Sequence, residues 1–220
     1  MIMKKILLIF LLFPFIVTAQ THKDSLKWAK DTLPLPHLPV DTSGIITYKI
    51  IETVPGVSKN ELYLRAKLWT AMAFKSAQNV IQLDDKEGGS LVIKALSVQY
   101  FEYKLFGLAN PIRYYLHYMA RFTIKEGKYR MIISDFTVET IASQYAASVS
   151  YPVDSDYKSL NEWNQNAKTG NMEFNRQSDL GGKSAVRIKF GIINDIDNVS
   201  KGLLADAKKT LSQPAKADDF

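Results

Sequence analysis

The 220-residue chain contains only three histidines, which limits the chemistry that its side chains can perform. His22 and His37 lie near the N-terminus, and His117 lies in a segment with a regular apolar pattern. No pair of histidines has the spacing of metal ligands, and the chain has no cysteine, so a zinc site would need carboxylates in unusual number. A lone histidine acts as a general base only beside a placed partner, which the sequence does not reveal. We therefore predict no metal, no cofactor and no catalytic residue.

The paired acidic residues and paired glycines have the chemistry of ordinary turns. Asp84–Asp85 and Asp154–Asp156 lack the ladder of oxygen ligands and the closing glutamate of a calcium loop. Gly88–Gly89 and Gly181–Gly182 lack the lysine and the strand, loop and helix frame of a phosphate-binding loop. No serine lies in a nucleophile-elbow pattern. We therefore predict that the protein is not an enzyme; the alternative is an envelope hydrolase whose carboxylates come together on folding.

A mixed aromatic and basic group is the best candidate for a binding site. Tyr115, His117 and Arg121 share one side of a single alternating segment. Such a strip of side chains could bind a protein surface, a peptide or a glycan. The alternative is an ordinary solvated sheet surface, where the same residue types occur.

The segment from Ile112 to Lys125 has the clearest two-residue period in the chain. Six of its residues point to one side: Tyr114, Leu116, Tyr118, Ala120, Phe122 and Ile124. The three candidate binding residues point to the other side, together with Met119, Thr123 and Lys125. This period indicates an antiparallel strand with one face buried and one face in water.

A helix from Ser58 to Ala77 is the element around which we expect the domain to pack. Its apolar residues recur at helical spacing along about five turns, at Leu62, Ala66, Trp69, Ala73 and Ala77. Ser58 and Glu61 have the spacing of a capping box, and Val57 can contact the first turn. We expect Trp69 to be a buried core residue because it lies in the middle of the apolar stripe.

The other patterns complete an order of strand, helix, strand meander and helix. Besides the strand already described, we expect strands at residues 44–54, 79–84, 90–106 and 129–141. A second long helix is expected after an N-cap at Asn194, with an apolar stripe at Ile196, Val199, Leu203, Ala207 and Leu211. These elements predict a two-layer α+β fold, in which two long helices pack on one face of a mainly antiparallel sheet of about five strands.

Residues 143–183 form a polar excursion before the final helix. Ser159 and Glu162 have capping-box spacing, so the excursion holds either a short helix or a disordered insert. Residues 186–190 then alternate apolar and basic side chains, which predicts an extended run returning to the sheet.

The N-terminal residues predict export. Two lysines, an apolar run of about a dozen residues and small residues before Gln20 form a signal peptide at residues 1–19, cleaved after Ala19. A proline-containing leader, a single domain and a flexible tail follow, at residues 20–43, 44–212 and 213–220. We expect the mature chain to be periplasmic or secreted, with no membrane span.

The net charge bears on which partners the protein can bind, and the lack of cysteine bears on what stabilises its fold. The formal net charge is +6, and loss of Lys4 and Lys5 with the signal peptide lowers it to +4. The basic residues are spread along the chain, so we expect no binding to nucleic acid by an exported protein. Without cysteine there are no disulfides, and the apolar core itself must stabilise the domain.

Several motifs follow one another between residues 44 and 142. They are Val54-Pro-Gly-Val-Ser-Lys-Asn-Glu-Leu-Tyr63, Arg65-Ala66, Trp69, Asn79-Val-Ile-Gln82, Asp85-Lys-Glu87 and the strand around Tyr129-Arg130. Together they resemble a family of exported bacterial domains of unknown function described as having a TBP-like fold. The resemblance implies an arrangement of strands and helices and brings no catalytic residues. A TBP-like fold does not by itself imply DNA binding.

The favoured hypothesis is a non-enzymatic binding or assembly module of the bacterial cell envelope that uses the open face of its sheet. Its partner would be an unknown protein, peptide or glycan. The hydrolase is one alternative, and a structural subunit of a homo-oligomer is another. A flat, uncovered sheet face favours the binding module, whereas a deep pocket with two carboxylates favours the hydrolase.

Overall fold

The structure, a computed structural model, describes residues 35–74, 77–105, 108–141, 147–169 and 182–213. The predicted signal peptide, most of the predicted leader, Gly181 and the end of the predicted tail lie outside these segments.

Six strands and four helices occur in the described part of the chain. The strands are β1 (Tyr48–Thr53), β2 (Ile81–Asp85), β3 (Ser90–Leu105), β4 (Leu108–Lys125), β5 (Lys128–Thr140) and β6 (Ser150–Pro152). The helices are α2 (Lys59–Ala73), α3 (Ala77–Val80), α4 (Asp154–Thr169) and α5 (Gly182–Leu211).

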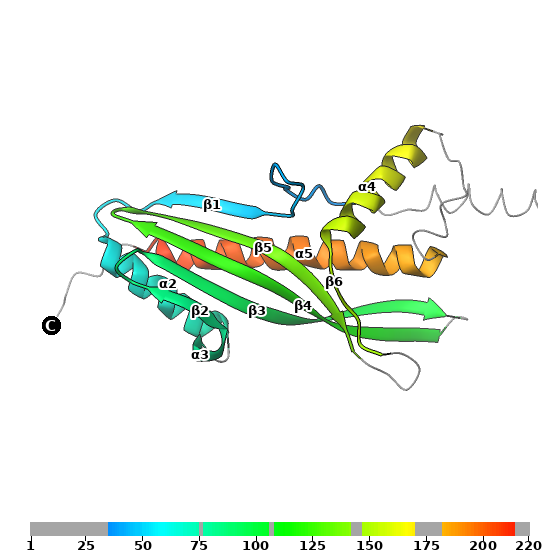
Figure 1. The fold of residues 1–220 in the computed structure, drawn as a ribbon, viewed down its shortest axis with the longest axis horizontal. Coiled ribbons are helices and arrows are strands. Elements are labelled where there is room, and N and C mark those ends of the chain that lie inside the picture. The colour runs from blue at the N-terminus through cyan, green and yellow to red at the C-terminus, as the bar shows by residue number, and fades with distance from the viewer. Residues whose placement is uncertain (1–34, 75–76, 106–107, 142–146, 170–181, 214–220) are drawn as a thin grey trace, which may run out of the picture.

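All six strands belong to one antiparallel sheet, in the order β1-β5-β4-β3-β2 (Figure 1). β1 pairs with Lys128–Ile133 of β5, and β6 pairs with Thr137–Glu139 of the same strand. Because β4 occupies the other side of β5, β1 and β6 follow one another along a single edge of β5.

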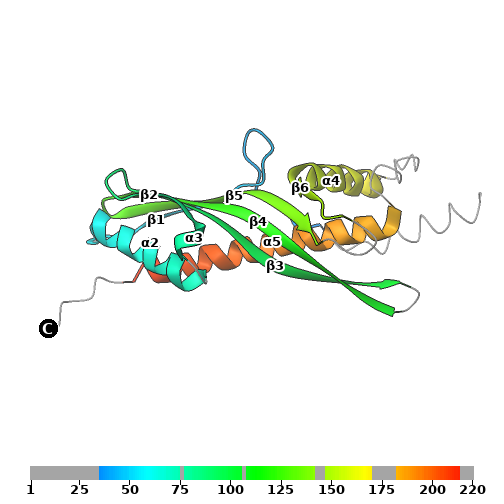
Figure 2. The ribbon, with the colours of Figure 1, turned by 60° about the horizontal axis from the view of Figure 1, so that its bottom comes forward.

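Helices α2 and α5 lie on the same face of this sheet (Figure 2). The strands turn alternate side chains toward them, and the following are buried: Leu91, Ile93, Tyr114, Leu116, Tyr118, Ala120, Phe122, Ile124, Met131, Ile133, Phe136 and Val138. The predicted α+β fold, with two long helices on one face of an antiparallel sheet, is therefore confirmed. The sheet has six strands instead of about five.

Helix α2 begins where its capping residues predict. Ser58 is the N-cap, and its Oγ accepts a hydrogen bond from the backbone N–H of Glu61 at 3.2 Å. This bond satisfies one of the backbone donors that a helix leaves unpaired at its start. Val57 is buried just before the cap, and Leu62 and Ala66 are buried within the helix.

Helix α2 ends earlier than the sequence predicts. Trp69 is fully buried, and its ring makes edge contacts with Phe74 and Phe122 at centroid distances of 5.8 and 5.4 Å. Phe74 has an extended backbone (φ −124°, ψ 134°), which ends α2 at Ala73. The predicted continuation to Ala77 is therefore wrong, because aromatic packing against Trp69 replaces the last helical turn.

The predicted extended run at residues 186–190 is also wrong, because residues 182–211 form one 30-residue helix, α5. Val186, Phe190 and Ile193 are buried at helical spacing. Asn194 is not an N-cap; its Nδ2 donates to the carbonyl of Phe190, one turn earlier, at 2.8 Å. The stripe predicted after it is fully buried at Ile196, Ala207 and Leu211.

The polar excursion contains helix α4, so the helical alternative holds for residues 154–169. The helix begins at Asp154, ahead of the capping box at Ser159. Tyr157 and Leu160 are buried against the core, as is Val153 just before the helix. This part of the excursion therefore belongs to the packed domain.

The packed domain also includes the end of the predicted leader. Leu38 is fully buried, and its N–H donates to the hydroxyl of Tyr157 at 2.8 Å. A bridge between Val40 and Ile46 follows. Packing therefore begins at least as early as Leu38, before the expected start at Gly44.

Candidate functional site on the open sheet face

The sheet face opposite α2 and α5 is not covered by any element of the described chain (Figure 2). This surface, the open face, carries the outward residues of β4: Tyr115, His117, Met119, Arg121 and Thr123. All five are half-buried, whereas the inward residues of β4 are buried, as its two-residue period predicts. The structure thus places the three candidate binding residues on one accessible surface.

His117 lies between an aromatic and an acidic side chain of the open face. Its Nε2 is 2.8 Å from Oε2 of Glu139 on β5, and its ring centroid is 6.4 Å from that of Tyr115. The guanidinium of Arg113 lies 5.6 Å from the centre of the Tyr115 ring, within the range of a cation–π contact. This half of the open face therefore combines one aromatic ring, two basic groups and one carboxylate.

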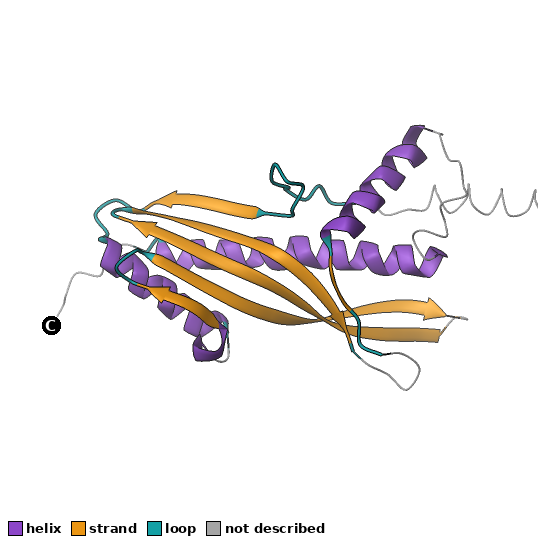
Figure 3. Cartoon of the chain, viewed as in Figure 1, coloured by secondary structure: helices purple, strands orange, loops and turns teal. Residues whose placement is uncertain are grey.

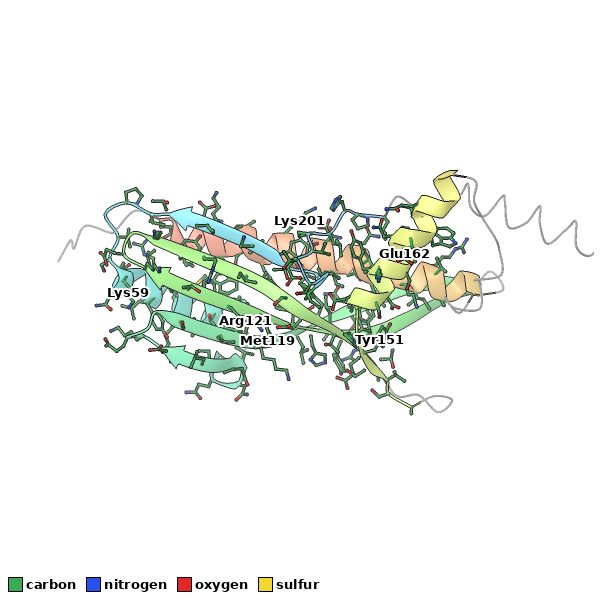
Figure 4. All side chains as sticks on the ribbon, turned by 45° about the horizontal axis from the view of Figure 1, so that its top comes forward. Lys59, Met119, Arg121, Tyr151, Glu162 and Lys201 are labelled. Atoms are coloured by element: carbon green, nitrogen blue, oxygen red, sulfur yellow. The ribbon has the colours of Figure 1, made fainter. Side chains whose placement is uncertain are left out.

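Arg121 is held by three neighbouring side chains. Its Nη1 donates to Oγ of Ser134 at 2.6 Å, and its Nη2 pairs with the carboxylate of Asp135 and lies 3.4 Å from Sδ of Met119. Figure 4 shows Met119 and Arg121 side by side near the middle of the sheet. These contacts fix the direction of the guanidinium, which presents its remaining donors to solvent in one orientation.

A β-bulge brings the carboxylate to Arg121. Asp135 has a left-handed backbone (φ 59°), which is uncommon for any residue except glycine. The register between β4 and β5 shifts by one residue at this point. Asp135 consequently lies exposed on the open face, while the next residue, Phe136, is buried in the core.

The sequence does not reveal Asp135 and Glu139, the two acids that pair with the predicted basic residues. A hairpin through Glu126–Gly127 with regular pairing would put His117 opposite Phe136. The bulge shifts the register of β5 against β4 by one residue. His117 therefore lies opposite Thr137, and its side chain reaches Glu139 on the same strand. The available signal was the hairpin itself, from which cross-strand neighbours can be counted to within one residue.

The acidic pairs that the sequence assigns to turns lie at the end of β2 and the start of α4, where they have structural partners. Asp84 accepts a hydrogen bond from Nζ of Lys67 at 2.7 Å, and this bond holds the pKa of Asp84 below its usual value. Asp85 accepts from the N–H of Gly88 at 2.7 Å, as expected of a turn. Asp154 accepts from a backbone N–H of another segment at 2.8 Å. Among the described residues, no group of three or more acids or histidines could hold a metal ion.

On the covered face, acids of α5 accept hydrogen bonds from aromatic side chains. The pairs are Tyr114 with Asp195 at 2.5 Å, Tyr48 with Asp197 at 2.8 Å and Trp69 with Asp206 at 2.9 Å. Burial, reinforced by the partner carboxylates, raises the pKa of Tyr48 and Tyr114, and burial raises the pKa of Tyr118 to about 12. The phenols of Tyr48 and Tyr114 are therefore neutral donors, and they attach α5 to the sheet.

A pocket of about 630 Å³ opens where α2 and α3 meet the edge of β3. Its lining is mostly apolar, with four polar residues: Asn79, Gln82, Lys94 and His117. No carboxylate of the described chain lines it. The two-carboxylate pocket that would favour a hydrolase is thus not found at this position.

Comparison with known proteins shows what the domain is similar to. Residues 48–139 match a family model described as a domain of unknown function (DUF4468) with TBP-like fold. The chain is similar to the crystal structure of a DUF4468 family protein from Bacteroides ovatus, with a TM-score of 0.53 and 13% identity over 82% of this chain and 93% of that chain. It is also similar to a TBP-like protein from Parabacteroides distasonis, with a TM-score of 0.46 and 12% identity over 79% of this chain and 98% of that chain. No curated protein matches the sequence.

The family match runs from the start of β1 to Glu139, one residue before the end of β5, and includes the open-face residues of β4. The likeness to the Bacteroides ovatus structure shows the fold alone, because the identity is low. Within the described segments, no helix is both long and apolar enough to cross a bilayer. The predicted resemblance is therefore confirmed: residues 48–139 match the DUF4468 family of domains of unknown function with a TBP-like fold.

Proposed function

We propose that this protein is a non-enzymatic binding module of the bacterial cell envelope, and that its open face contacts the partner. The observation that carries the proposal is the combination of an uncovered sheet face with side chains that are already held in place. Arg121 is fixed by Ser134 and Asp135, and His117 is fixed by Glu139. Side chains that are ordered before binding lose less conformational entropy when a partner arrives.

The residue types of the open face also support binding. Tyrosine and arginine are enriched among the residues that contribute most to protein interfaces, because each combines a large contact area with polar groups. Tyr115 and Arg121 lie on the same strand and are both accessible, with Met119 between them. A partner with acidic and apolar groups would complement this surface.

The proposed location in the envelope depends on the N-terminal residues. Residues 1–19 have the basic start, the apolar run and the small residues before the cleavage point that mark a signal peptide. Cleavage after Ala19 would release the mature chain outside the cytoplasm. N-terminal sequencing of the protein recovered from the cells that produce it tests this step directly.

A photocrosslinking experiment tests the open face. Benzoylphenylalanine replaces Tyr115 in one preparation and Lys201, an exposed residue of α5 on the other side of the sheet, in a second. The proposal expects crosslinked products with envelope proteins from the Tyr115 position and not from the Lys201 position. Introducing Arg121→Glu into the protein that carries benzoylphenylalanine at position 115 is expected to reduce those products.

Two outcomes would contradict the proposal. Identical products from both positions would show contact without preference for the open face. An absence of products at Tyr115, in a protein whose circular dichroism spectrum matches that of the wild type, would show that the face is not used.

A further inference from the structure

The outer edge of β3 is unpaired over most of its length. β2 pairs with Ser90–Ile93 only, whereas β3 continues to Leu105. No strand of the described chain lies beside residues 94–105 on this side (Figure 3). Alternate backbone N–H and C=O groups of this stretch therefore point away from β4 without a strand partner.

The side chains of residues 94–100 do little to protect this part of the edge from pairing. Exposed edge strands are usually blocked by charged residues, proline or bulges. Here Leu96, Val98 and Tyr100 lie on the same side of β3 and expose 49%, 38% and 66% of their surfaces. Lys94 is the one charged residue between positions 94 and 100, and no acid of the described chain forms an ion pair with it.

The pocket of about 630 Å³ lies beside the same edge. Phe74 and Val80 line it from the helical side, and Leu96 and Val98 line it from β3. Its volume is in the range of about 300–1,000 Å³ that is typical of ligand sites. An added strand would run along this pocket, and its alternate side chains would point into it.

The direction of an added strand follows from β2. β2 is antiparallel to β3, and its first residue, Ile81, lies opposite Ile93. A segment that continues the line of β2 beyond Ile81 would therefore be antiparallel to β3 and lie opposite residues 94–100. Apolar side chains would meet Leu96 and Val98, and an acidic side chain would meet the Lys94 ammonium.

A second copy of the chain centred on Val98, a residue that lines the pocket, fits this edge less well than a short segment. In a two-fold antiparallel pairing centred on Val98, residues 103–105 of the second copy would lie opposite residues 91–93. Those residues already pair with β2, which would have to be displaced. A short extended segment opposite residues 94–100 leaves the pairs between β2 and Ser90–Ile93 in place.

We propose that residues 94–100 of β3 bind an extended peptide segment of another protein as an additional antiparallel strand. The segment has apolar side chains at alternate positions and an acidic residue that pairs with Lys94. This inference rests on the proposed binding function and adds the class of partner. Backbone hydrogen bonds supply the affinity, and the pocket together with Lys94 supplies the selectivity.

A fluorescent synthetic peptide tests the strand addition. The sequence Val-Thr-Val-Thr-Phe-Thr-Glu places apolar residues opposite Tyr100, Val98 and Leu96 and glutamate opposite Lys94. Titration with the purified full chain, followed by fluorescence anisotropy, is expected to show saturable binding. Hydrogen exchange should slow at alternate backbone amides between residues 94 and 100.

Two matched controls separate strand addition from nonspecific apolar contact. Proline in place of the second valine, which lies opposite Val98, removes a backbone donor to β3 and fixes its φ angle, so binding should weaken about tenfold. A peptide ending in lysine should bind about threefold less well than the glutamate peptide, as for an exposed ion pair. The variant Lys94→Glu, an exposed substitution, should reverse this preference.

Three outcomes would overturn the inference: no saturable binding, binding that proline does not weaken, or exchange protection confined to other strands. Light scattering that shows a dimer with the edge amides already protected would also overturn it, in favour of a second copy. The crosslinking result at Tyr115 is independent of the peptide. If crosslinks persist while the peptide fails, the strand addition is wrong and the proposed binding function stands.

Discussion

The two faces of one sheet use polar side chains in opposite ways. On the covered face, carboxylates of α5 accept hydrogen bonds from neutral aromatic donors, such as Tyr114 with Asp195. On the open face, carboxylates of β5 pair with basic side chains, such as Arg121 with Asp135. The donors of the covered face are buried, whereas both members of the Arg121–Asp135 pair keep more than a third of their side-chain surface in solvent.

This difference indicates what each face contributes. A neutral aromatic donor satisfies a carboxylate without placing a second charge in the interior, so the pairs of the covered face can stabilise the domain. Exposed ion pairs contribute little, about 0–1 kcal/mol each. The pairs of the open face therefore serve mainly to orient side chains. Substitutions on the covered face should change the free energy of unfolding, and substitutions on the open face should change binding.

The largest expected effect is at Trp69. We expect Trp69→Ala to lower the free energy of unfolding by about 3–5 kcal/mol, because it removes the largest buried side chain between α2 and the sheet. The matched control is Tyr115→Ala on the open face, which should lower it by less than about 1 kcal/mol. Urea denaturation followed by circular dichroism measures both values. Equal losses would show that the open face stabilises the domain as much as the core does.

Neighbouring tyrosines of β4 provide a finer comparison. Tyr114→Phe removes the donor to Asp195 and should lower the free energy of unfolding by about 1–2 kcal/mol, since a partly buried carboxylate loses its hydrogen bond. Tyr115→Phe removes a hydroxyl that accepts only a long contact, 3.4 Å, from Arg113 within the described structure. Its effect should be close to zero. The same denaturation measurement applies, and a larger loss for Tyr115→Phe would contradict the contrast between the faces.

The sequence predicts most of the covered face and less of the open one. The inward residues of β4 follow a strict two-residue period over eleven positions, so their burial could be predicted correctly. The helical structure of the first part of α5 could not be predicted, because the five residues from Val186 to Phe190 fit a strand period as well as a helical one. Over so short a window, alternation does not distinguish a strand from a helix.

For the candidate site, the sequence predicts which residues share a face but not which residues pair with them. Tyr115, His117 and Arg121 could be assigned to one face because they belong to one strand. Their partners, Asp135 and Glu139, come from another strand whose register depends on a bulge. A bulge changes which residues face outward, and it depends on the backbone conformation of one residue, which alternation along the strand does not encode.

The bulge itself gives the third prediction. Asp135→Ala should lower the free energy of unfolding by about 1 kcal/mol, because alanine keeps the unfavourable left-handed backbone and loses the contact with Arg121. Asp135→Gly loses the same contact but adopts this backbone without strain, so its loss should be smaller. Thermal unfolding of the two variants separates backbone strain from the ion pair. If both variants lose the same stability, the contact with Arg121 dominates.

The smallest expected effect is a pH dependence of opposite sign at two acids. Burial raises the pKa of Asp195, so its contribution to stability is complete below its ordinary pKa and is lost as the pH rises through the folded-state value. Asp195→Asn should therefore become more stable relative to the wild type as the pH rises from about 3 to 6.

The hydrogen bond from Lys67 lowers the pKa of Asp84, whose contribution to stability is present above its ordinary pKa and lost as the pH falls. Asp84→Asn should accordingly become less stable relative to the wild type over the same rise in pH, in urea denaturation series at several pH values. Parallel trends for the two variants would mean that Asp195 is as well solvated as an exposed acid, and the contrast between the helix-covered interior and the surface would then fail at this position.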